Sequence, residues 1–425
     1  MHVVKFSEFE ELASYADRWD CLASGVPFRS WTWLSCWWRH YGHTGDSPRR
    51  NRLFILGVFD DLNQLVGLAP WYLQSHPVQG EILRWLGSGE VCSDHLSVLC
   101  EPALEDPLAE CLADYLVGQQ TKSGCEDSRW DLFEIDGVDG RNHAVLQLVK
   151  HLVDRGCLVR DRPALNCWRI ELPATWDKYL AMLSKGHRSR LRHLERTLFD
   201  TGRAVLHTVQ CDDELSLAMG ILVDLHQRRQ LSLGEPGCFA SKRFTAFHRE
   251  VTSLMLVKGQ LLFRWLALDG RPAAAEYILS SDGVNYVYQG GIAPELLDLT
   301  PGVLLTQIML RRTIEQGGRA VDFLRGDEPY KRHFRASASP CLTLHLIPDR
   351  PLARLRAGLW SAGRKAKRCM TYGLRDIGLL IESCAANVRA ERPKSPANPP
   401  DLRPAEIIGC AGIDNGSHAD QAEAR

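Results

Sequence analysis

The chain has 425 residues, 45% of them hydrophobic, and a formal net charge of −1 at pH 7. This length exceeds the size at which one hydrophobic core keeps growing, so we expect two domains and a shorter appendage. The balanced charge excludes steering of the whole molecule toward nucleic acid, and no nucleic-acid partner is expected.

The fourteen cysteines are dispersed and form no C-x-x-C pair, so we expect reduced thiols and no metal. The segment from Met1 to Glu11 contains acidic residues and no apolar core, unlike a signal peptide. No stretch reaches the length needed to span a membrane. These features predict a cytoplasmic protein.

In the first half, residues 30–41 form an aromatic-rich predicted helix whose Trp33, Trp37 and Tyr41 share one face, which we expect to be core. Strands are predicted at 53–59 and 64–73, as a hairpin, and at 130–135.

Asp94 and His95 follow a Gly-Ser-Gly loop and contain the groups of an acid/base pair. Adjacent side chains point in different directions, however, and no nucleophile motif accompanies them. We therefore expect a structural or substrate-contact role for both.

The second half opens with a predicted strand at 167–170 and a basic helix at 185–196. Leucines supply the apolar face of this helix, and four cations lie on the other: Lys185, Arg188, Arg192 and Arg196. Two readings stay open, a solvated helix face and a site for a phosphorylated or otherwise anionic acceptor.

A strand meander is predicted at 261–268, 273–280 and 284–289. Glu276 lies in its middle strand among apolar neighbours. Such a carboxylate is paired, exposed at an edge or functional, and the sequence leaves these three alternatives open.

Thr300-Pro301-Gly302 has the pattern of a helix start, with Thr as N-cap and Pro at the first helical position. The predicted helix runs from 303 to 316, between strands at 285–289 and 320–324. Free N–H groups and the positive end of the helix dipole favour phosphate binding, and Gly302 leaves room for it. A strand, an anion-binding helix start and a second strand predict a nucleotide-cofactor site.

The run from Val321 to Lys331 begins as a strand and breaks into turn and ionisable residues around Gly326 and Pro329. Its polar side chains are predicted to form a site: Arg325, Asp327, Glu328, Tyr330 and Lys331.

Further along the chain, residues 352–380 have the pattern of a basic amphipathic helix that lies on an anionic membrane surface or packs on the body of the protein. From residue 390 the composition predicts a disordered tail.

Three of these segments, LSKGHRSRLRHLER, TPGVLL and DFLRGDEPYK, resemble the CelD/BcsL type of GNAT acyltransferase with a BioF-like acetyltransferase domain, which is distantly similar to the FemABX aminoacyltransferases. The resemblance spans roughly Phe28 to Phe334 and is strongest after Trp168. Of the usual glycine-rich pyrophosphate loop, only Pro301-Gly302 is present. The resemblance implies an α/β (α+β) fold of tandem GNAT-like units with mixed sheets. The expected parts are 1–165, 166–350, a basic helical extension at 351–389 and a tail at 390–425.

The implied activity is transfer of an acyl group, acetyl by default, from coenzyme A to an amine or hydroxyl of a sugar or of a cell-envelope or exopolysaccharide precursor. Thr300, Gly302, Val303 and Leu304 would hold the acyl-CoA co-substrate, and the four cations with Arg325 and Lys331 would hold the acceptor.

An attacking amine must lose a proton, so Asp327 or Glu328 is the expected general base, with Glu276 as the next candidate and Tyr330 as the acid for the leaving thiolate. Direct transfer is expected because no Cys-His or Ser-His signature is visible. Two alternatives stay open, a FemABX-like aminoacyltransferase using aminoacyl-tRNA and a catalytically inactive binding protein of exopolysaccharide assembly. A cytoplasmic location, peripheral to the inner membrane through 352–380, completes the prediction.

Overall fold

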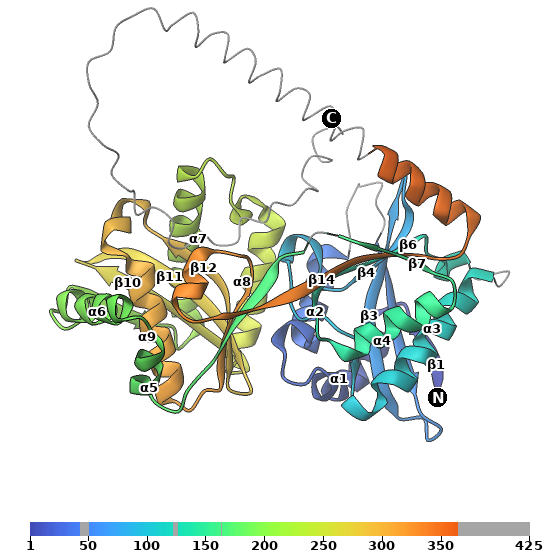
Figure 1. Ribbon diagram of the computed structural model, residues 1–425, viewed down its shortest axis with the longest axis horizontal. Helices are drawn as coiled ribbons and strands as arrows, with labels where there is room; N and C mark the ends of the chain where they lie inside the picture. The colour runs from blue at the N-terminus through green and yellow to red at the C-terminus, as the bar shows by residue number, and fades with distance from the viewer. Residues whose placement is uncertain (43–50, 122–125, 163, 364–425) are drawn as a thin grey trace, which may run out of the picture.

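The computed structural model describes residues 1–42, 51–121, 126–162 and 164–363 of the chain. Its fourteen strands form one continuous, strongly twisted sheet with helices on both faces (Figure 1). The predicted α/β fold with mixed sheets is therefore confirmed. The predicted tail and residues 364–380 of the predicted basic helix lie outside the described residues.

The first half of the chain builds one end of this sheet. Four antiparallel strands, β1 to β4, are followed by β6, which pairs with β4 in parallel. Short β5 (Leu99–Cys100) pairs with β3. The strands of this unit are β1 (His2–Phe6), β2 (Asn51–Phe59), β3 (Leu65–His76), β4 (Gly80–Trp85), β6 (Leu132–Asp139) and β7 (Leu158–Asp161).

Two helices cover each face of this first unit because alternate strand residues point to opposite faces. Phe54, Leu56 and Val58 of β2 pack under α3 (Glu105–Thr121) and α4 (His143–Asp154). On the other face, Leu53 and Ile55 pack under α1 (Ala16–Leu22) and α2 (Trp31–Tyr41). The predicted core stripe is confirmed, since Trp33, Trp37 and Tyr41 are buried.

The second half repeats the same strand pattern. Four antiparallel strands, β9 to β12, are followed by β13, which pairs with β12 in parallel. The predicted meander is confirmed in β10, β11 and β12. The strands of this unit are β8 (Asn166–Glu171), β9 (Ala204–Thr208), β10 (Leu261–Leu268), β11 (Arg271–Ser281), β12 (Val284–Ile292), β13 (Ala320–Arg325) and β14 (Ser337–Ile347).

Helices again cover both faces. One face carries α7 (Asp212–Ser232) and α8 (Lys242–Val257), the other α5 (Trp176–Met182), α6 (Lys185–Leu194) with a π-helical turn at Glu195–Phe199, and α9 (Pro301–Glu315). The predicted basic helix is thus confirmed as an amphipathic element, with Leu191, Leu194 and Leu198 buried. Short α10 (Pro329–His333) follows β13.

The two units share structure along β14 and between α2 and α8. Residues Ser337–Pro340 of β14 pair with β8 of the second unit, whereas Cys341–Leu346 pair with β6 of the first. Pairing with β14 extends β6 to Asp139, beyond the predicted end at residue 135. No local sequence pattern indicates this pairing, because the partner lies about 200 residues away. The ring of Trp33 meets Phe247 of α8 edge-on, with centroids 5.1 Å apart.

After β14 the chain forms a helix over residues 351–363, which lies on the first unit at the far end from α6 (Figure 1). Ala353 of this helix is buried against the first unit, and Arg350 and Arg356 both form ion pairs with buried Asp131. Part of the predicted basic helix therefore packs on the body. Among the described residues, no helix is both long and apolar enough to cross a membrane.

Candidate active site

The strands β12 and β13 are paired over the first part of their length and diverge after that. They pair only where Val284–Tyr286 faces Ala320–Asp322. Beyond Tyr286, β12 continues to Ile292 paired with β11, and a register shift there makes Tyr288 a β-bulge that bends the strand. β13 stays paired with β8 as far as Arg325. A cavity of about 630 Å³ occupies the gap between the diverging strands.

The start of α9 forms one wall of this cavity through Gly302, Leu305 and Thr306. Of the four predicted cofactor residues, only Gly302 is in the wall. Val303 and Leu304 are buried in the core between α9 and the sheet, where the helical period places them.

The N-cap prediction for Thr300 was right in position and wrong in mechanism. Pro301 is the first helical residue, but Thr300 adopts the left-handed conformation (φ 49°) and its side chain caps nothing. Its carbonyl accepts instead from the N–H groups of Val303 and Leu304. The Gly302 N–H, in the cavity wall, donates to no group in the described residues. This helix start therefore offers an anion fewer free N–H groups than the sequence predicted.

The end of β13 and the turn after it form the opposite wall, which includes Glu328, Tyr330 and Lys331. The Lys331 Nζ donates to the carbonyls of Leu324, Arg325 and Gly326 at 2.9–3.3 Å and lies 2.8 Å from a Glu328 carboxylate oxygen. Its side chain is 3% exposed. Lys331 thus holds the turn through its contacts, and its predicted role in binding the acceptor stays a prediction.

Arg325 is likewise paired with carboxylates, and its predicted role in binding the acceptor stays a prediction. Its Nε lies 2.5 Å from Asp94 and its Nη1 3.1 Å from Asp136, both in the first unit. Its backbone N–H also donates to Asp94. The side chains of Arg325 and Asp94 are 11% and 3% exposed. This cluster fixes the end of β13 against the first unit.

His95, next to Asp94, lies beside Asp322 of β13, with Nε2 3.1 Å from the carboxylate. Burial alone would lower the pKa of His95, but the neighbouring Asp322 carboxylate raises it above its usual value. Both members of the predicted Asp94-His95 pair therefore join the two units, in keeping with the expected structural role.

The three predicted catalytic residues separate in space. Glu328 and Tyr330 line the cavity, and the Tyr330 ring packs edge-on against Phe323. Asp327 is exposed and lies outside the wall. Its Oδ1 accepts from Asn166 and Trp168 of β8 at 2.9 and 3.0 Å.

Glu276 of β11 also lines the cavity and forms a buried ion pair with Arg264 of β10 at 2.7 Å. Burial raises the pKa of Glu276, and Arg264 opposes that shift. Of the alternatives that the sequence left open, pairing is the one the structure realises.

The four predicted acceptor-binding cations of the basic helix lie outside the cavity wall. Lys185, Arg192 and Arg196 are exposed and Arg188 is half-buried. Their recognition of an anionic acceptor stays a prediction.

Sequence reasoning missed the third wall, formed by α7 and the loop that follows it. His226, Glu235 and Cys238 line the cavity there, together with Gln289 of β12. No motif marks these residues. They meet only because the loop after α7 folds back over the helix toward β12.

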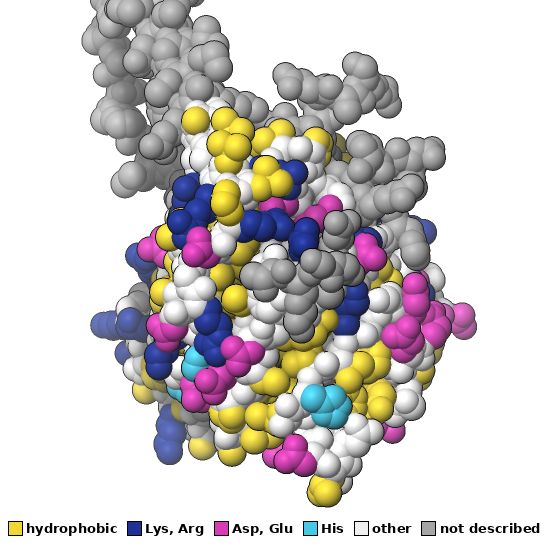
Figure 2. All heavy atoms as spheres, turned by 90° about the vertical axis from the view of Figure 1, so that its right-hand side faces the viewer, with side chains coloured by type: hydrophobic (Ala, Val, Ile, Leu, Met, Phe, Trp, Pro, Cys, Tyr) yellow, Lys and Arg dark blue, Asp and Glu magenta, His cyan; other side chains and the backbone are white. Residues whose placement is uncertain are grey.

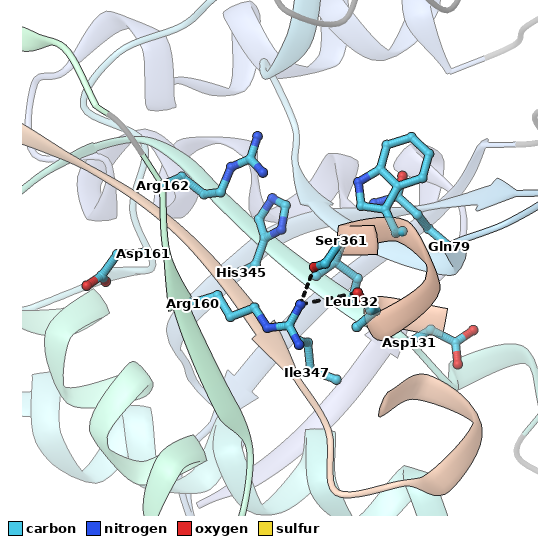
Figure 3. A pocket seen from close by; sticks show the side chains of 11 residues that line it. Gln79, Asp131, Leu132, Arg160, Asp161, Arg162, His345, Ile347 and Ser361 are labelled. Carbon is cyan, nitrogen blue, oxygen red and sulfur yellow. Dashed lines mark hydrogen bonds between the residues drawn. The ribbon is translucent and has the colours of Figure 1, made fainter. Parts of the chain in front are cut away.

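A second, smaller cavity of about 200 Å³ lies under the helix at 351–363 (Figure 3). Its Arg160 donates to the carbonyl of Ala357 and to the Ser361 hydroxyl, at 3.2 and 2.5 Å. Arg160, a charged residue of this cavity, therefore anchors the helix. The larger cavity is the better candidate for chemistry.

Comparisons with known proteins agree with this choice. Residues 185–332, about a third of the chain, match a family model described as the acetyltransferase (GNAT) domain. That segment contains β9 to β13 and the three cavity walls described above, namely the start of α9, the end of β13 with its turn, and α7 with its loop. A search of curated protein sequences found no match.

Among solved structures, a crystal structure of FemX aligns with a TM-score of 0.57 at 11% identity, over 84% of this chain and 99% of that one. A conserved protein of unknown function from Bacteroides thetaiotaomicron aligns with a TM-score of 0.49 at 12% identity, over 79% and 97%. A tandem GNAT protein from the clavulanic acid biosynthesis pathway aligns with a TM-score of 0.42 at 11% identity, over 82% and 99%. At such identities the FemX likeness shows the fold alone. Residues 185–332 are thus similar to the acetyltransferase (GNAT) domain, and the FemX likeness shows that the chain shares the fold of that protein.

Proposed function

We propose that the protein transfers an acyl group, acetyl by default, from coenzyme A to an amine in the cavity between β12 and β13. The observation that carries this proposal is the divergence of these two strands inside the GNAT-matched segment. It opens a cavity that extends from the start of α9 to the Glu328 carboxylate. The proposed donor and base thereby share one cavity.

The residues present fit coenzyme A. From Val287 onward only one edge of β12 is paired in the described structure, so its other edge offers N–H and C=O groups to the amides of a pantetheine arm. The Gly302 N–H and the positive end of α9 lie in the same cavity and suit a phosphate group. Bound there, coenzyme A supplies a thioester carbonyl that is open to attack.

The charge of the wall favours an amine acceptor over an anionic one. Its two cations are Arg325 and Lys331, and its five carboxylates are Glu90, Asp94, Glu235, Glu276 and Glu328. Both cations are already paired with carboxylates. The excess negative charge attracts a protonated amine, and Glu328 can accept the proton that the amine loses on attack.

A FemABX-like aminoacyltransferase is the second candidate, favoured by the likeness to FemX and by the exposed cations of α6 outside the cavity. Membership of the CelD/BcsL type and a sugar or exopolysaccharide acceptor are finer parts of the proposal that rest on the sequence resemblance alone. A cytoplasmic location is a further part, and it rests on the composition of the chain. Release of free thiol from acetyl-CoA with a panel of amines, without deacylation of aminoacyl-tRNA by the same amines, favours the first candidate. Acyl transfer from neither donor favours an inactive binding protein.

Replacing Gly302 by Leu should weaken coenzyme A binding at least tenfold, because the new side chain enters the wall where the phosphate approaches. Calorimetric titration measures this, with Gly186→Leu, in exposed α6, as the control that keeps parental affinity. Equal affinity of Gly302→Leu and the parent protein would remove the helix start from the donor site.

We further propose that the helix at 351–363 contacts a membrane surface. Leu352, Leu355 and Leu359 are 50–60% exposed along one side of it, and Figure 2 views this side of the molecule, where hydrophobic side chains gather next to Lys and Arg. Co-sedimentation with anionic vesicles should be lost in a Leu355→Ser, Leu359→Ser variant. Equal sedimentation of parent and variant would contradict this contact.

A further inference from the structure

The thiol of Cys238 stands beside an imidazole in the cavity wall. Its Sγ lies 3.5 Å from the Nε2 of His226, and the Nε2 of Gln289 donates to it at 3.2 Å. Both Cys238 and His226 line the cavity that we assign to the acyl donor. The two residues come from α7 and from the loop after it, twelve positions apart.

A third residue sets the tautomer of this imidazole. The Gln227 Nε2 donates to the carbonyl of Pro236 at 2.9 Å, which fixes the amide so that its Oε1 faces the His226 Nδ1 at 3.1 Å. The proton of neutral His226 is therefore on Nδ1, and the lone pair of Nε2 faces the Cys238 thiol. Burial lowers the pKa of His226, which keeps the imidazole neutral and able to accept a proton.

The backbone just before Cys238 packs closely against the Gln227 side chain. Gly237 has a φ of +71°, and a Cβ at this position would come within 2.2 Å of the Gln227 Oε1. Nucleophile, base and orienting amide thus have the arrangement that activates cysteine in enzymes with unrelated folds.

We propose that Cys238 accepts the acyl group from coenzyme A before the acyl group passes to the amine. This inference rests on the proposed function and replaces the direct transfer expected from the sequence. In the first half-reaction the Cys238 proton moves to His226 Nε2, the Sγ–acyl bond forms, and the bond between the acyl carbon and the coenzyme A sulfur breaks. His226 then gives its proton to the departing thiolate.

In the second half-reaction the amine attacks the acyl carbon and the bond to Sγ breaks. The amine enters protonated and loses one proton to the wall carboxylate before it attacks; the proton that it loses on forming the amide passes through His226 to the Cys238 thiolate. One thioester is exchanged for another and then for an amide, so no oxidant or reductant is required. The Gln289 amide stabilises the thiolate in both halves through its N–H.

Incubating the full-length protein with acetyl-CoA and no acceptor tests this. Intact-mass measurement and peptide mapping should find one acetyl group on Cys238, removable by neutral hydroxylamine as thioesters are. Cys238→Ala should abolish it, and His226→Gln should slow its formation roughly a hundredfold. Cys211→Ala is the control that keeps the label, because Cys211 is an exposed cysteine outside the cavity wall.

The outcomes separate this inference from the proposed function. A parent protein that binds acetyl-CoA by calorimetry but acquires no label on Cys238 overturns the covalent route and leaves acyl transfer standing. A label that persists in Cys238→Ala overturns it as well. A parent protein that neither binds acetyl-CoA nor is labelled overturns both. Melting temperatures of the variants show whether each one is folded.

Discussion

Replacing Glu328 by Gln lowers turnover roughly a hundredfold to ten-thousandfold, the range for loss of a general base, while coenzyme A affinity stays at the parental value. Glu328 is the carboxylate at the end of β13 that faces the cavity, and its side chain is 17% exposed. Gln keeps the shape of the side chain but cannot accept a proton. Lys331 keeps its three carbonyl partners in this variant, so the turn should persist.

Asp327→Asn is the control for this experiment. Asp327 is the neighbouring carboxylate, yet it is exposed, lies outside the cavity wall and serves Asn166 and Trp168. We expect near-parental turnover. Steady-state kinetics, calorimetry with coenzyme A and melting temperature should be measured for both variants. Parental turnover in Glu328→Gln would place the base elsewhere, and Glu276 would be tested next.

The Arg325→Met variant should lose roughly 3–5 kcal/mol of folding stability, because it leaves Asp94 as an uncompensated buried charge between the two units. Denaturant unfolding measures this loss. Replacing Asp94 by Leu in the same chain should recover part of the stability, since a buried pair exchanged for apolar side chains is often neutral.

Arg203→Met supplies the surface control, because Arg203 pairs with Asp269 where both side chains are about half exposed. We expect its denaturation midpoint to match the parent's, as exposed ion pairs contribute little. If the free energy of unfolding of Arg325→Met is also within about 0.5 kcal/mol of the parent's, the Arg325–Asp94 ion pair does not hold the two units together.

Local patterns predicted the elements that frame the cavity. The meander, the Pro301 helix start and the strand that ends near Arg325 all have short-range signals, namely alternation, a proline at the first helical position and a turn pair. These signals involve residues that are close in sequence, so the elements they predict form largely independently of tertiary partners.

The parts that escaped prediction depend on distant partners. Arg325 and Asp94 are separated by 231 positions, and nothing near either residue indicates that they meet. Besides Glu328, the partners of Lys331 are backbone carbonyls, which leave no trace in the sequence. The Cys238-His226 contact requires the loop after α7 to fold back, and its only local sign is Gly237.

Hydrogen–deuterium exchange with and without coenzyme A tests most directly whether the donor binds between β12 and β13. Amides of residues 287–291, on the strand edge that β13 leaves open, should gain protection when coenzyme A is added. Amides of β2 and β3 in the first unit should not change. Protection confined to the first unit, or no change at residues 287–291 at saturating coenzyme A, would contradict the assignment of this cavity as the acyl-donor site.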